Sequence, residues 1–184
     1  MKTKAKGFTV LEVIITLAIT TMIIGTVYTF FFTSSKSLKN TDINSTLQSE
    51  GQAIENELIL YGTQAEKLVS IDSTNSENIT YNELAPSNGI KDVNSSIVFL
   101  VHGVNYLFEI NGQTLTLQKE GEQQKKELTR NIKSFKVRPI DIKIDPKDNL
   151  DKAIGLEFVI VLHKKEGYSD VTVPVSTIVK FRNK

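Results

Sequence analysis

The chain has 184 residues, with 22 lysines and arginines against 21 aspartates and glutamates, and a formal net charge of +1. This balance gives no basis for bulk electrostatic binding to nucleic acid, which needs a strongly basic surface. No cysteine is present, so disulfide frameworks, thiolate metal sites and a cysteine nucleophile are excluded. The length allows one ordinary domain and an additional anchoring segment.

The N-terminus joins a short basic segment to a long apolar run. Three lysines precede Gly7, and residues 8–32 contain Glu12 as their one charged residue. A helix of this length spans about 37 Å, enough to cross a hydrocarbon core of about 30 Å. The run is longer than the core of a cleaved secretory signal, so we expect it to persist as a single-pass anchor. The flanking lysines favour a cytoplasmic N-terminus and an extracytoplasmic head.

A carboxylate inside an apolar run needs a physical explanation, because burying it in a bilayer costs a few kcal/mol and marks a candidate functional residue. Glu12 lies near the cytoplasmic end, where it could also reach the lipid headgroups. If the chain were cut before Phe8, the new α-amino group would lie four residues from Glu12. The amine of a neighbouring copy could then pair with this carboxylate and offset the desolvation of both charges.

The segment KGFTVLEVIITLAI, residues 6–19, closely resembles the class III signal of type IV prepilins and type II secretion pseudopilins. The resemblance implies that a prepilin peptidase cuts between Gly7 and Phe8 and methylates Phe8, and that Glu12 acts in assembly. It implies three further partners: other pilin or pseudopilin subunits, an inner-membrane assembly platform and the lipid bilayer. Many family members carry a helix-breaking proline in this segment, where this chain has only Gly25 and Thr29.

An amphipathic helical half should follow the apolar run and end at Gly62, a plausible stop. One face of this helix carries apolar residues at helical spacing, and Gly51 lies on the same face, where we expect either a close contact with a sheet or a weak point in the helix. The apolar residues are Ile43, Leu47, Ile54, Leu58 and Tyr61.

The C-terminal half changes to the period-two pattern of β-strands. Residues 104–110 alternate and are followed by Asn111-Gly112, a strong hairpin signal that would place Phe108 opposite Leu115 and Tyr106 opposite Leu117. We expect further strands at 97–101, at 135–144 with a bend around Pro139, at 156–162 in the sheet centre, and at 171–181.

These elements predict an α+β fold, with one long N-terminal helix packed on an antiparallel β-sheet. The expected divisions are a cleaved leader (1–7), a transmembrane and assembly helix (8–32), an amphipathic helix (33–62), a polar connecting loop (63–96) and a β-sheet region (97–184). Within the pilin family, QAIENEL (52–58) and the terminal Arg182-Asn183 resemble minor pilins of the W type, J-type pseudopilins and the F-type competence pseudopilin.

Residues suited to catalysis or metal binding do not form a known motif. Four aspartates lie within DIKIDPKDNLD (141–151), a region where some pseudopilins hold calcium, but interleaved lysines and Pro146 favour a solvated loop. His102 and His163 lack ligand spacing. We therefore expect no catalytic residue, no metal and no cofactor. The aspartates are Asp141, Asp145, Asp148 and Asp151.

A basic stretch, 119–138, holds seven cationic and three acidic residues. We rank a solvated hairpin edge guarded by lysines first, docking onto a neighbour's acidic 141–151 loop second, and single-stranded nucleic acid third.

The sequence thus predicts a minor type IV pilin or pseudopilin, held in the membrane as a precursor and then assembled into a fibre at the cell surface, with an initiating or tip position as a candidate role. The alternative function is a surface binding module, either an adhesin or a DNA-uptake competence pilin, whose head domain binds a ligand.

Overall fold

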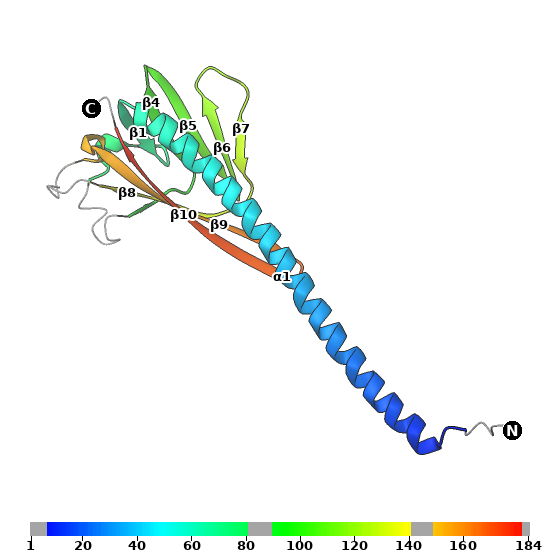
Figure 1. The fold of residues 1–184 in the computed structure, drawn as a ribbon. Coiled ribbons are helices and arrows are strands. Elements are labelled where there is room, and N and C mark those ends of the chain that lie inside the picture. Colours follow the sequence, from blue (N-terminus) through cyan, green and yellow to red (C-terminus); the bar gives the residue numbers. More distant parts are fainter. Residues whose placement is uncertain (1–6, 81–89, 141–148, 182–184) are drawn as a thin grey trace. The chain divides into compact units, whose positions relative to one another are not determined.

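The computed structural model of the protein describes residues 7–80, 90–140 and 149–181. Two compact units divide the chain, residues 1–42 and residues 43–184, and we refer to them as the anchor unit and the head. Figure 1 shows the elements in chain order, from the long helix α1 to the last strand β10. Their bounds are α1 (Val10–Gln64), β1 (Lys67–Ile71), β2 (Thr74–Asn75), η1 (Ser76–Asn78), β3 (Lys91–Asp92), β4 (Ser96–Val101), β5 (Val104–Asn111), β6 (Thr114–Lys119), β7 (Lys126–Thr129), β8 (Ile132–Pro139), η3 (Leu150–Lys152), β9 (Gly155–Glu166) and β10 (Ser169–Lys180).

The anchor unit holds the apolar part of α1. Its large apolar side chains between Phe8 and Phe32 are 42–82% exposed, so they have no packed protein core of their own. This part of α1 is long and apolar enough to cross a membrane. The exposed apolar surface suits lipid as its solvent, and the helix fits a single-pass membrane anchor.

The head half of α1 is amphipathic, as predicted. Its buried residues follow the expected stripe: Ile43, Leu47, Gly51, Ile54, Leu58 and Gly62. Tyr61 is partly buried and packs against the same core. Gly51 makes the expected close contact, because an added Cβ would lie 2.6 Å from Val175 Cγ2 of β10. The helix does not end at Gly62. It continues to Gln64, and Gly62 instead lets the backbone approach Val179, 2.5 Å from where its Cβ would be.

Among the described residues, the head strands form two antiparallel sheets rather than the single sheet that we predicted. One has the order β2-β1-β4-β5-β6-β7 and the other β10-β9-β8-β3. Phe99 of the first sheet and Phe158 of the second meet edge to face with ring centroids 6.0 Å apart. Phe108 and Phe135 extend this aromatic cluster on either side, so the two sheets share one core. The α+β prediction is confirmed.

The β5–β6 hairpin exists, but its predicted register is wrong by two residues. Phe108 pairs with Leu117 rather than Leu115, and Asn111 pairs with Thr114. The turn residues are therefore Gly112 and Gln113, not Asn111 and Gly112. Gly112 has φ +62° and takes the first turn position, which is the type II′ arrangement. The shift is even, so the predicted inward face is preserved.

The segment 63–96 contains more regular structure than the predicted polar loop. It holds β1, β2, η1 and β3, and the side chains of Leu68 and Ile71 are completely buried. Asp72 and Ser73 form a tight turn between β1 and β2, with φ of 50° and 67°. Aspartate tolerates the left-handed region that this turn requires, and β1 also pairs with β4 along its other edge.

Other strand predictions agree with the structure over the described residues. β9 is central in its sheet, pairing with β8 on one side and β10 on the other. β8 ends at Pro139, where a bend was expected. The predicted continuation through residues 141–144 lies outside the described part of the chain.

Candidate processing and assembly site

The Gly7–Phe8 bond lies in non-helical backbone just before α1. Both residues are exposed, and the helix begins at Val10. A Cβ added at Gly7 would meet no atom within 4 Å. The bond is therefore open to solvent in this structure. The leader residues 1–6 lie outside the described part.

Thr9 caps the start of the helix. Its Oγ1 accepts a hydrogen bond from the Glu12 backbone N–H at 3.3 Å, and its carbonyl oxygen accepts one from Val13 N at 3.2 Å. The sequence Thr9-Val-Leu-Glu12 has the spacing of a capping box, a signal that could have predicted this boundary. Capping fixes the backbone of the first turn, which carries Glu12.

Glu12 lies in the first turn of α1 with an exposed side chain. The unpaired N–H groups of a helix start carry partial positive charge, which stabilises a carboxylate there. The predicted site residues Gly7, Phe8 and Glu12 thus lie together at one helix end.

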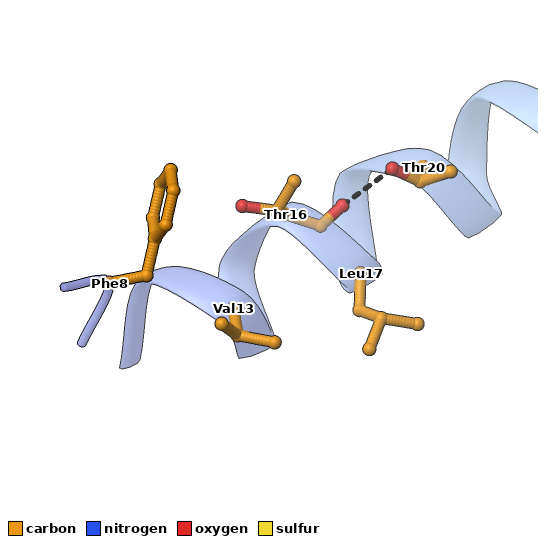
Figure 2. Close-up of a pocket in the computed structure, with 5 residues that line it drawn as sticks. All are labelled: Phe8, Val13, Thr16, Leu17 and Thr20. Atoms are coloured by element: carbon orange, nitrogen blue, oxygen red, sulfur yellow. Dashed lines mark hydrogen bonds between the residues drawn. The ribbon is translucent and has the colours of Figure 1, made fainter. Parts of the chain in front are cut away.

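Threonine hydroxyls in the apolar segment are satisfied by the helix itself. Thr16 Oγ1 donates to the Glu12 carbonyl oxygen, and Thr20 Oγ1 donates to that of Thr16 at 2.7 Å. Figure 2 shows the second bond together with Phe8, Val13 and Leu17, which line an open apolar hollow along the first turns. Because these donors are paired internally, threonine is compatible with a lipid environment.

The basic stretch 119–138 is largely neutralised within the chain. Six of its seven cationic residues lie within 4 Å of a carboxylate: Lys119–Glu122, Lys125–Glu109, Lys126–Glu57, Arg130–Glu127, Lys136–Asp92 and Arg138–Glu157. The hydrogen bond to Glu57 raises the pKa of Lys126 above its usual value, and the same kind of bond to Glu127 raises that of Arg130. This pairing agrees with the first-ranked interpretation, a solvated hairpin edge.

A small aromatic pocket lies beside this stretch in the head. Tyr61 stacks on Tyr106 with ring centroids 4.3 Å apart, and the pocket between them and the β6–β7 turn measures about 310 Å³. Burial raises the pKa of Tyr61, and the Glu57 carboxylate adds to the effect. Sequence reasoning missed this pocket, since it joins residues from α1, β5 and the β6–β7 turn.

The two histidines and the aspartates offer no metal site in the part of the chain that the structure describes. His102 occupies the β4–β5 turn at φ 50°, and His163 Nε2 lies 2.9 Å from Asp170 Oδ1 across the β9–β10 hairpin. The two lie in different hairpins. The suggested calcium ligands Asp141, Asp145 and Asp148, and the side chain of Asp151, lie outside the described residues.

Comparison with known proteins identifies the N-terminus only. Residues 2–28 match the prokaryotic N-terminal methylation motif, which is the signal of the type IV pilin family. No curated protein and no solved structure matches the chain significantly. The motif covers Gly7, Phe8 and Glu12, and it implies a precursor that a prepilin peptidase processes and that assembles with other pilins. It points to a structural rather than an enzymatic protein.

Proposed function

We propose that the chain is the precursor of a minor type IV pilin or pseudopilin that enters a fibre through its N-terminal helix. The observation that carries this is the methylation motif at residues 2–28, which runs directly into an apolar helix long enough to span a membrane. The antiparallel head behind that helix gives the same order of parts that the resemblance implies. The precursor spans the membrane once, with its N-terminus in the cytoplasm and its head outside.

Processing takes place between Gly7 and Phe8, and Phe8 becomes the methylated N-terminus. The exposed, non-helical backbone at this bond supports the assignment, because a peptidase needs its substrate out of the helix to reach the amide. The cap at Thr9 leaves the bond outside the hydrogen-bonded turns.

Glu12 acts in assembly by pairing with the α-amino group of Phe8 on a neighbouring copy. An isolated carboxylate in hydrocarbon is costly, and an adjacent ammonium group removes much of that penalty. Each subunit carries both charges near one helix end, so the pairing sets the axial stagger between neighbours. The minor role and a position at the fibre start or tip rest on the resemblance to W, J and F types, and this resemblance is common to pilus, secretion pseudopilus and competence pseudopilus.

Substitution of Glu12 tests this function. Glu12→Gln keeps the size and removes the charge, Glu12→Asp keeps the charge on a shorter side chain, and Glu55→Gln, in the head half of the same helix, is a matched control. The measurement is the amount of processed protein in sheared surface fibres relative to the membrane fraction of native cells. We expect Glu12→Gln to be cleaved normally but excluded from fibres, and Glu12→Asp to be incorporated better than Glu12→Gln. Normal incorporation of Glu12→Gln would contradict the pairing.

A further inference from the structure

The β9–β10 hairpin is the longest in the head. Its two strands pair along their whole length, from Gly155 opposite Lys180 to Glu166 opposite Ser169. Gly167, at φ 60°, and Tyr168 make the two-residue turn. We call residues 164–170 the hairpin tip.

Contacts with α1 show which way the tip points. Gly51 lies against Val175, and Gly62 lies against Val179, so β10 and the head half of α1 run in the same direction (Figure 1). The tip is therefore toward the Ile43 end of the head. Both elements can be followed from the Gly51–Val175 contact toward the N-terminus of the chain. In this direction α1 covers about 12 Å to Ile43, whereas β10 and its turn cover about 23 Å to Tyr168. Measured from that contact, the strand therefore covers a greater length to the tip than the helix covers to Ile43.

The Ile43 end is where the head is joined to its anchor. Only residues 33–42 separate it from the apolar run that ends at Phe32, a tether of about 16 Å while it is helical. When the apolar run is inserted in a bilayer, this end of the head is the one held close to the membrane surface.

The tip carries side chains suited to that surface. Tyr168 is 78% exposed, so its ring lies on the surface of the tip. Tyrosine is enriched at membrane interfaces, where its ring meets apolar atoms and its hydroxyl meets water. Lys165 is exposed on the same tip, and Lys164 Nζ lies 3.7 Å from Glu166, while Asp170 balances the charge of Lys165 in the count over residues 164–170.

We propose that the hairpin tip docks into the headgroup layer of the membrane in which the precursor is anchored, with Tyr168 as its interfacial side chain. The proposal rests on the membrane-anchored state given under the proposed function. Tethering keeps the tip at a high effective concentration near lipid, so a weak intrinsic affinity is sufficient. Docking gives the head a second point of attachment and so a defined orientation before it leaves the membrane.

The absence of tryptophan from the sequence permits a direct test with single-tryptophan variants of the full chain. Tyr168→Trp reports on the tip. Ile178→Trp is the matched control, since Ile178 is a 59% exposed apolar residue at the far end of the same strand. Phe30→Trp reports on insertion of the anchor. Each variant is placed at one chain per lipid nanodisc, which prevents a second copy from covering the tip, with lipids brominated near the headgroup as quenchers.

The proposal predicts that Tyr168→Trp and Phe30→Trp lose emission in brominated lipid and shift to the blue, while Ile178→Trp does neither. Lys165→Glu added to Tyr168→Trp should reduce the quenching in discs that contain anionic lipid. If Phe30→Trp is quenched and Tyr168→Trp behaves like Ile178→Trp, the docking inference is wrong and the anchor stands. If Phe30→Trp is not quenched, the membrane-anchored state fails, and the docking inference fails with it.

Discussion

Gly51 of α1 and Val175 of β10 are in such close contact that a methyl group on Gly51 would lie 2.6 Å from Val175 Cγ2. About three helical turns further along α1, Gly62 and Val179 repeat the relationship. Two glycines eleven residues apart thus let the helix lie directly on the strand. Glycine weakens a helix by about 1 kcal/mol relative to alanine, so this close packing has a local cost.

Gly51→Ala should destabilise the head in spite of the better helix propensity of alanine. The added methyl group meets a β-branched side chain on a paired strand, which cannot rotate away freely, and overpacking of this kind costs about 1–3 kcal/mol. The free energy of unfolding, from denaturant titration of the full chain in detergent, measures the effect.

Two variants provide controls for this substitution. Val175→Ala combined with Gly51→Ala should recover stability, because it removes the clashing methyl group. Gly25→Ala, where nothing lies within 4 Å of the new Cβ, should leave head unfolding unchanged. A Gly51→Ala variant that is more stable than the parent chain would contradict the prediction, because it would show that α1 and β10 can move apart without loss of stability.

Glu50 should stabilise the attachment of α1 to the β7–β8 turn. Its carboxylate accepts hydrogen bonds from the buried Thr129 hydroxyl at 2.5 Å and from Asn131 Nδ2 at 2.9 Å. Glu50→Ala removes the acceptor from both donors, for an expected loss of about 1–3 kcal/mol in the free energy of unfolding. Gln52→Ala, on the exposed side of the same helix, is the matched control. Equal effects of the two variants would argue against a role for this network.

Asp72 should make head stability depend on pH in the acid range. Burial alone would raise its pKa, but backbone N–H groups of Ser95, Asn94 and Ser96 hydrogen-bond to the carboxylate and bring the pKa below the usual 3.8. A lowered folded-state pKa means that the stabilisation is complete above about pH 4 and is lost as pH falls through the folded-state value.

Asp72→Asn removes the charge and retains a side chain that tolerates the left-handed backbone at this position. We expect it to be less stable than the parent chain at neutral pH and to converge with it at low pH. Thermal unfolding between pH 2 and pH 7 measures both. A constant difference across this range would mean that the carboxylate charge is not involved.

Lys126 and Glu57 should form an ion pair whose two charges can be exchanged between the positions without loss of stability. Their Nζ and Oε1 atoms lie 2.5 Å apart, and the Glu57 side chain is only 16% exposed. Lys126→Ala should cost no more than about 1 kcal/mol, as for other surface pairs, and Lys126→Glu should cost more because two carboxylates then meet. Adding Glu57→Lys to Lys126→Glu should restore stability. Failure of this double variant to recover would place the effect of Lys126 outside the pair.

The sequence predicts those parts of the fold that depend on periodicity. The helical stripe from Ile43 to Leu58 and the inward face of β5 follow from apolar spacing alone, because burial selects one face of each element. The short strands β1 and β3 were not predicted, since their pairing depends on contacts with β4 and β8 far along the chain. Local composition in that segment indicates only a loop.

The hairpin register was predicted wrongly because the prediction relied on the turn preference of Asn111-Gly112. Asn111-Gly112 favours a type I′ turn, but the structure uses Gly112-Gln113 and extends β5 by one residue, so that Ile110 pairs with Leu115. Both registers place two apolar residues of β5 opposite Leu115 and Leu117, so cross-strand apolar pairing does not by itself select the observed one.

The candidate site at the N-terminus can be recognised from the sequence alone, because no tertiary contact is needed to bring its residues together. Gly7, Phe8 and Glu12 are recognisable because their spacing along one segment defines the motif. The ion pairs of the basic stretch could not be predicted in the same way, since partners such as Glu57 and Glu157 come from other elements. Charge counts alone gave only the ranking of a solvated hairpin edge, docking and single-stranded nucleic acid.

The central claim is that the chain is a prepilin cut at Gly7–Phe8. Intact mass and N-terminal sequencing of the protein from its native membrane, beside Gly7→Ala, test it most directly. Because a methyl group at Gly7 meets no neighbouring atom, loss of cleavage in that variant reports on the peptidase and not on folding. The claim predicts a mature chain that starts at methylated Phe8 and a variant that keeps its leader. Retention of residues 1–6 in the parent protein would contradict it, because Glu12 would then have no nearby amine on its neighbour.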